Sequence, residues 1–297
     1  MKYTAEIAAI ITAASWTVGI TLFEEASKRA GVVVVNFVKV VFALVMLTLF
    51  VLVTHRYIIA PVPNDALAWM ALSGLVGFVI GDLFLFKALT MIGARITMLV
   101  YALTPALAAF GAFIFLHETL APVAIAGVAL TLSGIALVIL RRKNGESHAD
   151  MKHRMTGALF AFIAAVSQAC GYLFSKQGMR SIEPLTATQL RLATAVVGFA
   201  AVLIVTRKAG AMLRTLREKP MLLRLTAASF FGPSFGVAMS MVALKNGHAG
   251  VVSTIMAMTP VLLLIPAVTI FKEKIGLREI AGAVLAVAGV ALFFIKL

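Results

Sequence analysis

The sequence predicts an all-α membrane protein with ten transmembrane helices, arranged as two inverted five-helix repeats. Three observations carry this prediction: the composition, ten apolar windows, and an internal duplication of five spans. Of 297 residues, 62% are hydrophobic and 13% are charged, whereas soluble domains have about 45–50% apolar and about 25% charged residues. We therefore exclude a soluble enzyme and a disordered chain, and expect a multi-pass protein embedded in the lipid bilayer of the cell (inner) membrane.

The chain is strongly basic, since it has 26 Lys and Arg residues against 12 Asp and Glu, which gives a net charge of +14. Basic loops on one side of a membrane explain this excess, so we expect no nucleic-acid partner. The single cysteine, Cys170, excludes an internal disulfide and a cysteine metal site. We expect no cofactor and no metal.

Ten windows are long and apolar enough to span a bilayer, for which about 20 residues are needed. They are residues 5–23, 32–53, 66–88, 95–116, 121–140, 155–174, 185–206, 223–244, 250–271 and 277–295.

The second half of the chain repeats the first. With a shift of 155 residues, 16 of the 53 pairs between 88–140 and 243–295 are identical without a gap. The earlier spans align with a shift of 152, which places Gly19 on Gly171 and Lys39 on Arg191. The predicted division is repeat 1 at 1–140, a polar linker at 141–154 and repeat 2 at 155–297.

Five spans per repeat is an odd number, so the second copy enters the membrane upside down. Inverted repeats are typical of secondary transporters, because exchanging the conformations of two similar halves opens a central site to each side in turn. Since both halves lie in one chain, a monomer suffices; a dimer is also compatible with the sequence.

Each half carries the same spaced motif of Pro, Glu, Gly and Gly, preceded in the first span by Ser15-Trp16-Thr17-Val18-Gly19. The motif residues are Pro105, Glu118, Gly127 and Gly134, and Pro260, Glu273, Gly282 and Gly289. The chain thereby resembles the EamA-type transporters of the drug/metabolite transporter superfamily. The resemblance implies a basket of ten helices with a cavity lined by spans one, three, four, six, eight and nine. Spans five and ten would pack together at one side.

Asp82 lies in the middle of the third span, where a charge is costly and marks a candidate functional site. It is either a proton-coupling or amine-binding carboxylate, or an ion-paired residue that joins spans two and three, with Lys39 as its natural partner. Lys39 and Arg191 either receive a substrate carboxylate or serve structural pairing and snorkelling.

The remaining candidates fall into three groups. Polar-tipped side chains on the cavity-lining spans are candidate solute contacts, prolines within spans are candidate hinges, and paired glycines are predicted to allow close helix packing. The solute contacts are Trp16, Tyr101, Gln168, Tyr172, Ser234 and Thr254; the hinges are Pro105, Pro233, Pro260 and Pro266; the packing residues are Gly127, Gly134, Gly282 and Gly289.

Orientation has two conflicting indications. Loops after the odd-numbered spans hold 17 Lys and Arg against 6 on the side of the termini, which by the positive-inside rule places both termini outside. The family resemblance implies termini inside.

The favoured function is a secondary transporter of small organic solutes working by alternating access. It would export amino acids or related metabolites, driven by protons or by the solute gradient. The alternative is a multidrug exporter of amphipathic cationic compounds. An intramembrane enzyme is a remote third hypothesis, because Asp82 lacks a second intramembrane aspartate and the sequence has no HExxH or GxSxG motif. We therefore predict that the protein is not an enzyme. Neither the solute nor the direction of transport follows from the sequence.

Overall fold

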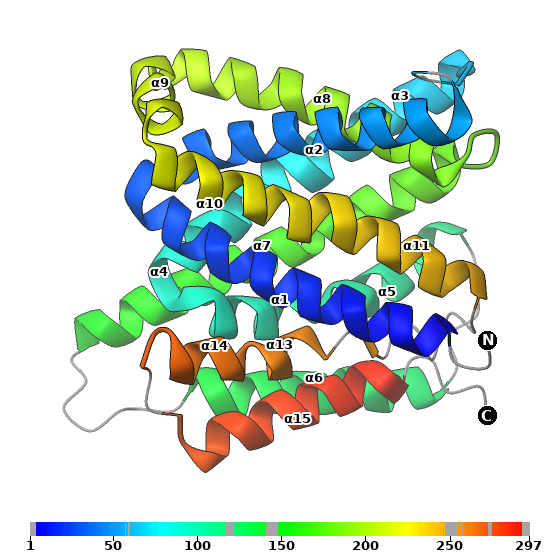
Figure 1. Ribbon diagram of the computed structural model, residues 1–297. Helices are drawn as coiled ribbons and strands as arrows, with labels where there is room; N and C mark the ends of the chain where they lie inside the picture. Colours follow the sequence, from blue (N-terminus) through cyan, green and yellow to red (C-terminus); the bar gives the residue numbers. More distant parts are fainter. Residues whose placement is uncertain are drawn as a thin grey trace.

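The computed structural model describes residues 4–56, 58, 60–116, 122–140, 148–246, 255–256, 258–272 and 275–292. Within these residues all regular structure is helical. Figure 1 shows a bundle in which the beginning of α1 and the end of α15 lie at the same end.

The described residues of the first half form six α-helices and one π-helical segment. They are α1 (Thr4–Ala30), α2 (Val32–His55), α3 (Asn64–Ser73), η1 (Gly74–Ile80), α4 (Gly81–Tyr101), α5 (Thr104–Leu116) and α6 (Pro122–Ile139).

The described helices of the second half follow a similar order. They are α7 (His148–Gly178), α8 (Pro184–Val205), α9 (Ala209–Arg217), α10 (Lys219–Ser229), η2 (Phe230–Gly236), α11 (Val237–Asn246), α13 (Thr259–Leu262), α14 (Leu264–Thr269) and α15 (Leu277–Leu292).

Two glycines with positive φ angles make sharp changes of direction in the first half. Gly31 separates α1 from α2 with φ 86°, and Gly93 breaks α4 with φ 77°. Only glycine adopts such angles without a steric penalty from Cβ. The break at Gly93 falls between the third and fourth expected spans.

π-Helical turns occur at equivalent places in the two halves. Gly74–Ile80 lies between α3 and α4, and Phe230–Gly236 lies between α10 and α11. Pro233 has no N–H to donate to a regular α-helical hydrogen bond, which disfavours an unbroken helix in η2. π-Turns are rare and are found frequently at functional sites.

Five helical segments are long and apolar enough to cross a membrane: Thr4–Ala30, Val32–His55, Asn64–Tyr101, Ala149–Gly178 and Pro184–Val205. Three further apolar helices are shorter, at Thr104–Phe115, Ile125–Ile139 and Thr259–Thr269. The all-helical fold is thus present, while the full set of ten spans stays a prediction.

Helices pair across the two halves. α6 packs along α15, as the family resemblance implies, α2 packs along α8, α4 along α7, and α1 along α11. In Figure 1 the α6–α15 pair lies at one edge of the bundle and the α2–α8 pair at the opposite edge.

The outer surface of the bundle is apolar. Val53, Ile125, Val197, Val205 and Leu223 are all at least 69% exposed. Many buried core residues are alanines, including Ala9, Ala26, Ala161, Ala164 and Ala195. Large apolar groups outside and small residues between helices are the pattern expected of helices packed within lipid.

Candidate functional site

Two glycine pairs bring helices from opposite halves into backbone contact. Gly19 of α1 lies against Gly232 of η2, and Gly171 of α7 lies against Gly77 of η1. A Cβ built on Gly19 or Gly171 would be 2.9 Å from the partner glycine's Cα. Because Gly19 aligns with Gly171 and Gly77 with Gly232, the α1–η2 crossing and the α7–η1 crossing are equivalent positions of the duplicated unit.

Lys39 and Asp82 form the ion pair expected from the sequence. The Lys39 Nζ donates to Asp82 Oδ2 at 2.5 Å, and their side chains are only 7% and 9% exposed. The ammonium also lies over the Phe86 ring, 4.3 Å from its centroid. The pair therefore joins α2 to α4 in a desolvated, aromatic setting.

Arg191 occupies a different environment from its repeat equivalent Lys39. It is 9% exposed, and its Nε and Nη2 atoms have no hydrogen-bond partner among the described residues. Its guanidinium carbon lies 4.7 Å from the Phe78 ring centroid and 5.9 Å from that of Tyr172. Arg191 thus brings a positive charge from α8 against the π-helical turn of the first half. Asp82 is near enough to interact with it electrostatically, but no acid among the described residues is hydrogen-bonded to it.

The α7–η1 crossing is polar. Ser73 Oγ donates to the Gly171 carbonyl at 2.6 Å and lies 2.7 Å from Ser175 Oγ. Gln168 Oε1 and Arg191 Nη2 both border Gly77, at 3.3 and 3.1 Å from the position that a Cβ there would take.

Two tyrosines complete this polar region. Tyr101 and Tyr172 both lie near Arg191, and Tyr101 also lies near Asp82. Tyr172 is 46% exposed, whereas Gln168 beside Gly77 is buried. We call Lys39, Asp82, Tyr101, Gln168, Tyr172 and Arg191 the central polar cluster.

The α1–η2 crossing is mainly apolar. Trp16, which aligns with Gln168, packs against Gly236, and Phe23 borders Gly232. Ser234 donates a hydrogen bond to the Met46 sulfur at 3.4 Å. Neither Trp16 nor Ser234 belongs to the central polar cluster.

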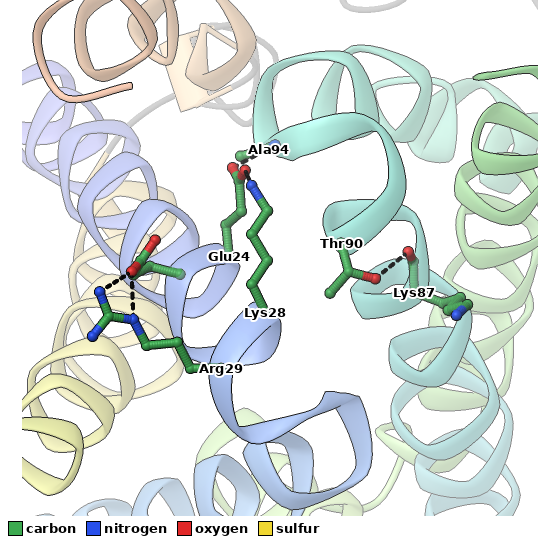
Figure 2. Close-up of polar contacts among 7 residues, drawn as sticks. Glu24, Lys28, Arg29, Lys87, Thr90 and Ala94 are labelled. Carbon is green, nitrogen blue, oxygen red and sulfur yellow. Dashed lines mark hydrogen bonds and ion pairs between the residues drawn. The ribbon is translucent and has the colours of Figure 1, made fainter. Parts of the chain in front are cut away.

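A charged contact holds the loop between the third and fourth expected spans. Figure 2 shows Glu24 of α1 between Lys28 and Ala94. The backbone N–H of Ala94 donates a hydrogen bond to Glu24 Oε2, with an N–O distance of 2.7 Å. Next to it, Arg95 Nη1 lies 3.3 Å from Glu279 Oε2 of α15, and the two side chains are 11% and 4% exposed. Two carboxylates from opposite halves therefore fix the chain directly after Gly93.

Comparison with known proteins assigns the family. The sequence model of the EamA-like transporter family matches residues 3–140 and again residues 155–295. The chain belongs to the EamA-like transporter family. It is accordingly an integral, multi-pass membrane transporter with two EamA repeats.

A structural comparison agrees with this assignment at the level of the fold. A solved structure titled "Crystal structure of protein" matches with a TM-score of 0.63 over 97% of this chain and 95% of its own, at 18% sequence identity. At such low sequence identity, the match shows that the two proteins share a fold and nothing more. A comparison with curated proteins gives no match.

The four candidate hinge prolines of this EamA-like protein occupy different positions within its helices. Pro105 and Pro260 are the second residues of α5 and α13, where a missing N–H costs little. Pro233 lies within η2, and Pro266 lies within the short helix α14.

The paired glycines lie at the contact of α6 and α15. Gly134 approaches the Gly282 carbonyl, and Gly289 approaches the Gly127 carbonyl, so that an added Cβ would meet backbone in both places. Thr131 Oγ1 donates to Gly127 O at 2.9 Å and lies 3.3 Å from Ala286 O across the helix pair.

Two motif residues and one candidate solute contact, Glu118, Glu273 and Thr254, lie outside the described residues. Among the residues that the structure does describe, no group of three or more His, Cys, Asp or Glu side chains could hold a metal ion.

Four residues at these contacts, Gly77, Gly232, Glu24 and Glu279, are not among the site residues expected from the sequence. The alignment at a shift of 155 pairs Gly77 with Gly232, so a search for glycines shared by the third and eighth spans would have found both. Glu24 carried a weaker signal as an acidic residue at the end of an apolar span.

Proposed function

We propose that this protein is a secondary transporter that exports amino acids or related small metabolites by alternating access. Its ten spans would form two inverted five-helix repeats, and export would be driven by protons or by the solute gradient. Family membership supports transport. The beginning of α1 and the end of α15 lie at the same end of the bundle, which agrees with an even number of membrane crossings.

The central polar cluster is the observation that carries this proposal. Ionisable side chains are rare inside membrane bundles and mark pathways for solutes or protons. This cluster draws Lys39, Asp82 and Tyr101 from the first repeat and Tyr172 and Arg191 from the second. A group shared by both halves would change its surroundings when the halves rearrange, as alternating access requires.

The charge of the cluster favours metabolites over cationic drugs. Asp82 is already bound by Lys39, and Arg191 adds a positive charge nearby. A cationic drug would have to displace Lys39 from Asp82 and approach Arg191 against repulsion. Multidrug export is therefore the lesser candidate.

Export is tested by mass spectrometry of the medium. Cells that express the wild type, Asp82→Asn or no transporter are fed dipeptides that overload their amino-acid pools. Asp65→Asn is the matched control, because Asp65 is an exposed acid in the first turn of α3. Immunoblots equalise the amount of each protein in the membrane.

We expect one or a few metabolites to accumulate outside cells with the wild type and with Asp65→Asn. Asp82→Asn should lose this accumulation. If all media match those of cells without the transporter, amino-acid export is wrong; drug-resistance assays with cationic and neutral compounds then test the lesser candidate.

A further inference from the structure

Arg191 is the one member of the central polar cluster whose charged group is buried and incompletely hydrogen-bonded among the described residues. Its Nε and Nη2 atoms are inaccessible and have no hydrogen-bond partner in the described part of the chain. Three other arginines differ, because Arg29, Arg95 and Arg224 each contact a glutamate. A buried guanidinium with unpaired N–H groups is unfavourable unless a partner of opposite charge completes it.

We propose that Arg191 binds a carboxylate of the transported solute, so that the solute class is monocarboxylates and zwitterions. This inference rests on the proposed function and identifies one binding residue for it.

The two unpartnered nitrogens form one edge of the guanidinium. Nε–H and an N–H of Nη2 point in the same direction in the planar group, and such a pair matches the two oxygens of a carboxylate. The Phe78 and Tyr172 rings contact the group without accepting these hydrogen bonds. This edge could form two parallel hydrogen bonds, and it forms none with the residues that the structure describes.

The charge balance sets the number of anionic groups. Lys39 and Asp82 neutralise each other, and Arg191 leaves the cluster with one surplus positive charge. One carboxylate restores neutrality. A dicarboxylate or a phosphate ester would bring a second negative charge that nothing else in the cluster matches.

The space beside Arg191 depends on Gly77. A Cβ at this position would lie 3.1 Å from Arg191 Nη2 and 3.3 Å from Gln168 Oε1. The Tyr172 ring centroid lies 5.9 Å from the guanidinium carbon, and Tyr172 is 46% exposed. A solute approaching along Tyr172 would thus meet the guanidinium and the Gln168 amide together.

Binding is measured on the purified full-length protein in lipid nanodiscs, from the shift of its thermal unfolding midpoint with solute concentration. The probes are leucine, leucinamide, 4-methylpentanoate and 3-methylbutylamine, which share a branched apolar end and differ in the carboxylate and the amine. Acetate and propionate extend the carboxylates to smaller sizes. The variants are Arg191→Gln and Arg191→Lys, with Arg180→Gln as a control because Arg180 is exposed in the turn after α7.

The wild type and Arg180→Gln should be stabilised by leucine or by the carboxylates, and not by leucinamide or 3-methylbutylamine. Arg191→Gln should weaken carboxylate binding about 10- to 100-fold, the loss typical of hydrogen bonds to a charged group. Arg191→Lys keeps the positive charge but loses the planar edge, so its carboxylate affinity should lie between those of the wild type and Arg191→Gln.

The inference is overturned if leucinamide binds as tightly as leucine, if no carboxylate stabilises the wild type, or if Arg191→Gln binds carboxylates unchanged. Should Arg191→Gln fail to fold, Arg191→Lys decides in the same way. Export measured in cells is independent of these results. Export without a need for Arg191 refutes only this inference, whereas binding through Arg191 without export refutes only the proposed function.

Discussion

The α1–η2 and α7–η1 crossings share a backbone arrangement and differ in chemistry. Both place a glycine of one half against a glycine of a π-helical turn in the other. At the α1–η2 crossing the neighbours are Trp16 and Phe23, whereas at the α7–η1 crossing they are Gln168, Ser73 and Arg191. The two crossings therefore share one backbone arrangement, and only the α7–η1 crossing is polar.

The basic residues of the second and seventh expected spans differ in the same way. Lys39 is neutralised by Asp82, an acid whose repeat equivalent is Val237. Arg191 has no acid within hydrogen-bonding distance among the described residues. On our proposal, these equivalent positions with different charge partners would let the Lys39–Asp82 pair hold the structure and Arg191 bind a solute.

Breaking the Lys39–Asp82 pair should have the largest effect on stability. Asp82→Asn leaves the Lys39 ammonium buried without an anion, which typically costs about 3–5 kcal/mol of unfolding free energy. The double variant Lys39→Met/Asp82→Leu removes both charges and should recover most of that loss. Thermal unfolding of the purified proteins in detergent measures both. A single variant as stable as the wild type would show that the pair is not desolvated.

Replacing the glycine of either crossing by alanine should be the next largest effect. Gly19→Ala and Gly171→Ala each place a Cβ 2.9 Å from a backbone Cα, and such overpacking typically costs about 1–3 kcal/mol. Similar losses at both sites would support equivalent crossings. Gly210→Ala in α9 is the control, because its Cβ would meet nothing within 4 Å; a large loss there, or none at Gly19 and Gly171, would contradict the packing described.

Ser73 and Ser229, which lie near the two crossings without being repeat equivalents, should give smaller effects that differ in sign. Ser73→Ala removes hydrogen bonds to Gly171 and Ser175 and should cost about 0.5–1.5 kcal/mol. Ser229 Oγ is buried without a partner among the described residues, so Ser229→Ala should be neutral or slightly stabilising. Thermal unfolding of the two variants side by side tests this, and equal losses would mean that the two crossings do not differ in polarity.

Composition and repeats predicted those features of the fold that can be read from short stretches of sequence. An all-helical, two-repeat membrane protein follows from apolar windows and from the shared Pro, Glu and Gly spacing. The breaks within the helices were harder to predict, because Gly93 and the π-turn at Gly74–Ile80 do not interrupt the apolar pattern.

The site was predicted in part. Asp82 stood out because a charge within an apolar span is costly, and Lys39 followed as the nearest cation of the preceding span. The unequal environments of Lys39 and Arg191 could not be predicted, since their repeat positions are equivalent and only contacts between the halves distinguish them. The close contact of Gly77 with Arg191 is likewise a contact between distant segments.

The central claim is that the α7–η1 crossing binds the solute, whereas the α1–η2 crossing only packs the helices. A comparison of export by the Gly77→Ala and Gly232→Ala variants tests this claim most directly. These glycines are repeat equivalents, and each new Cβ meets a side chain at a similar distance: Arg191 Nη2 at 3.1 Å, or the Phe23 ring at 3.2 Å. Mass spectrometry of the medium, at matched membrane levels, should show export lost in Gly77→Ala and retained in Gly232→Ala. Equal export by both variants, or a greater loss in Gly232→Ala, would contradict the claim.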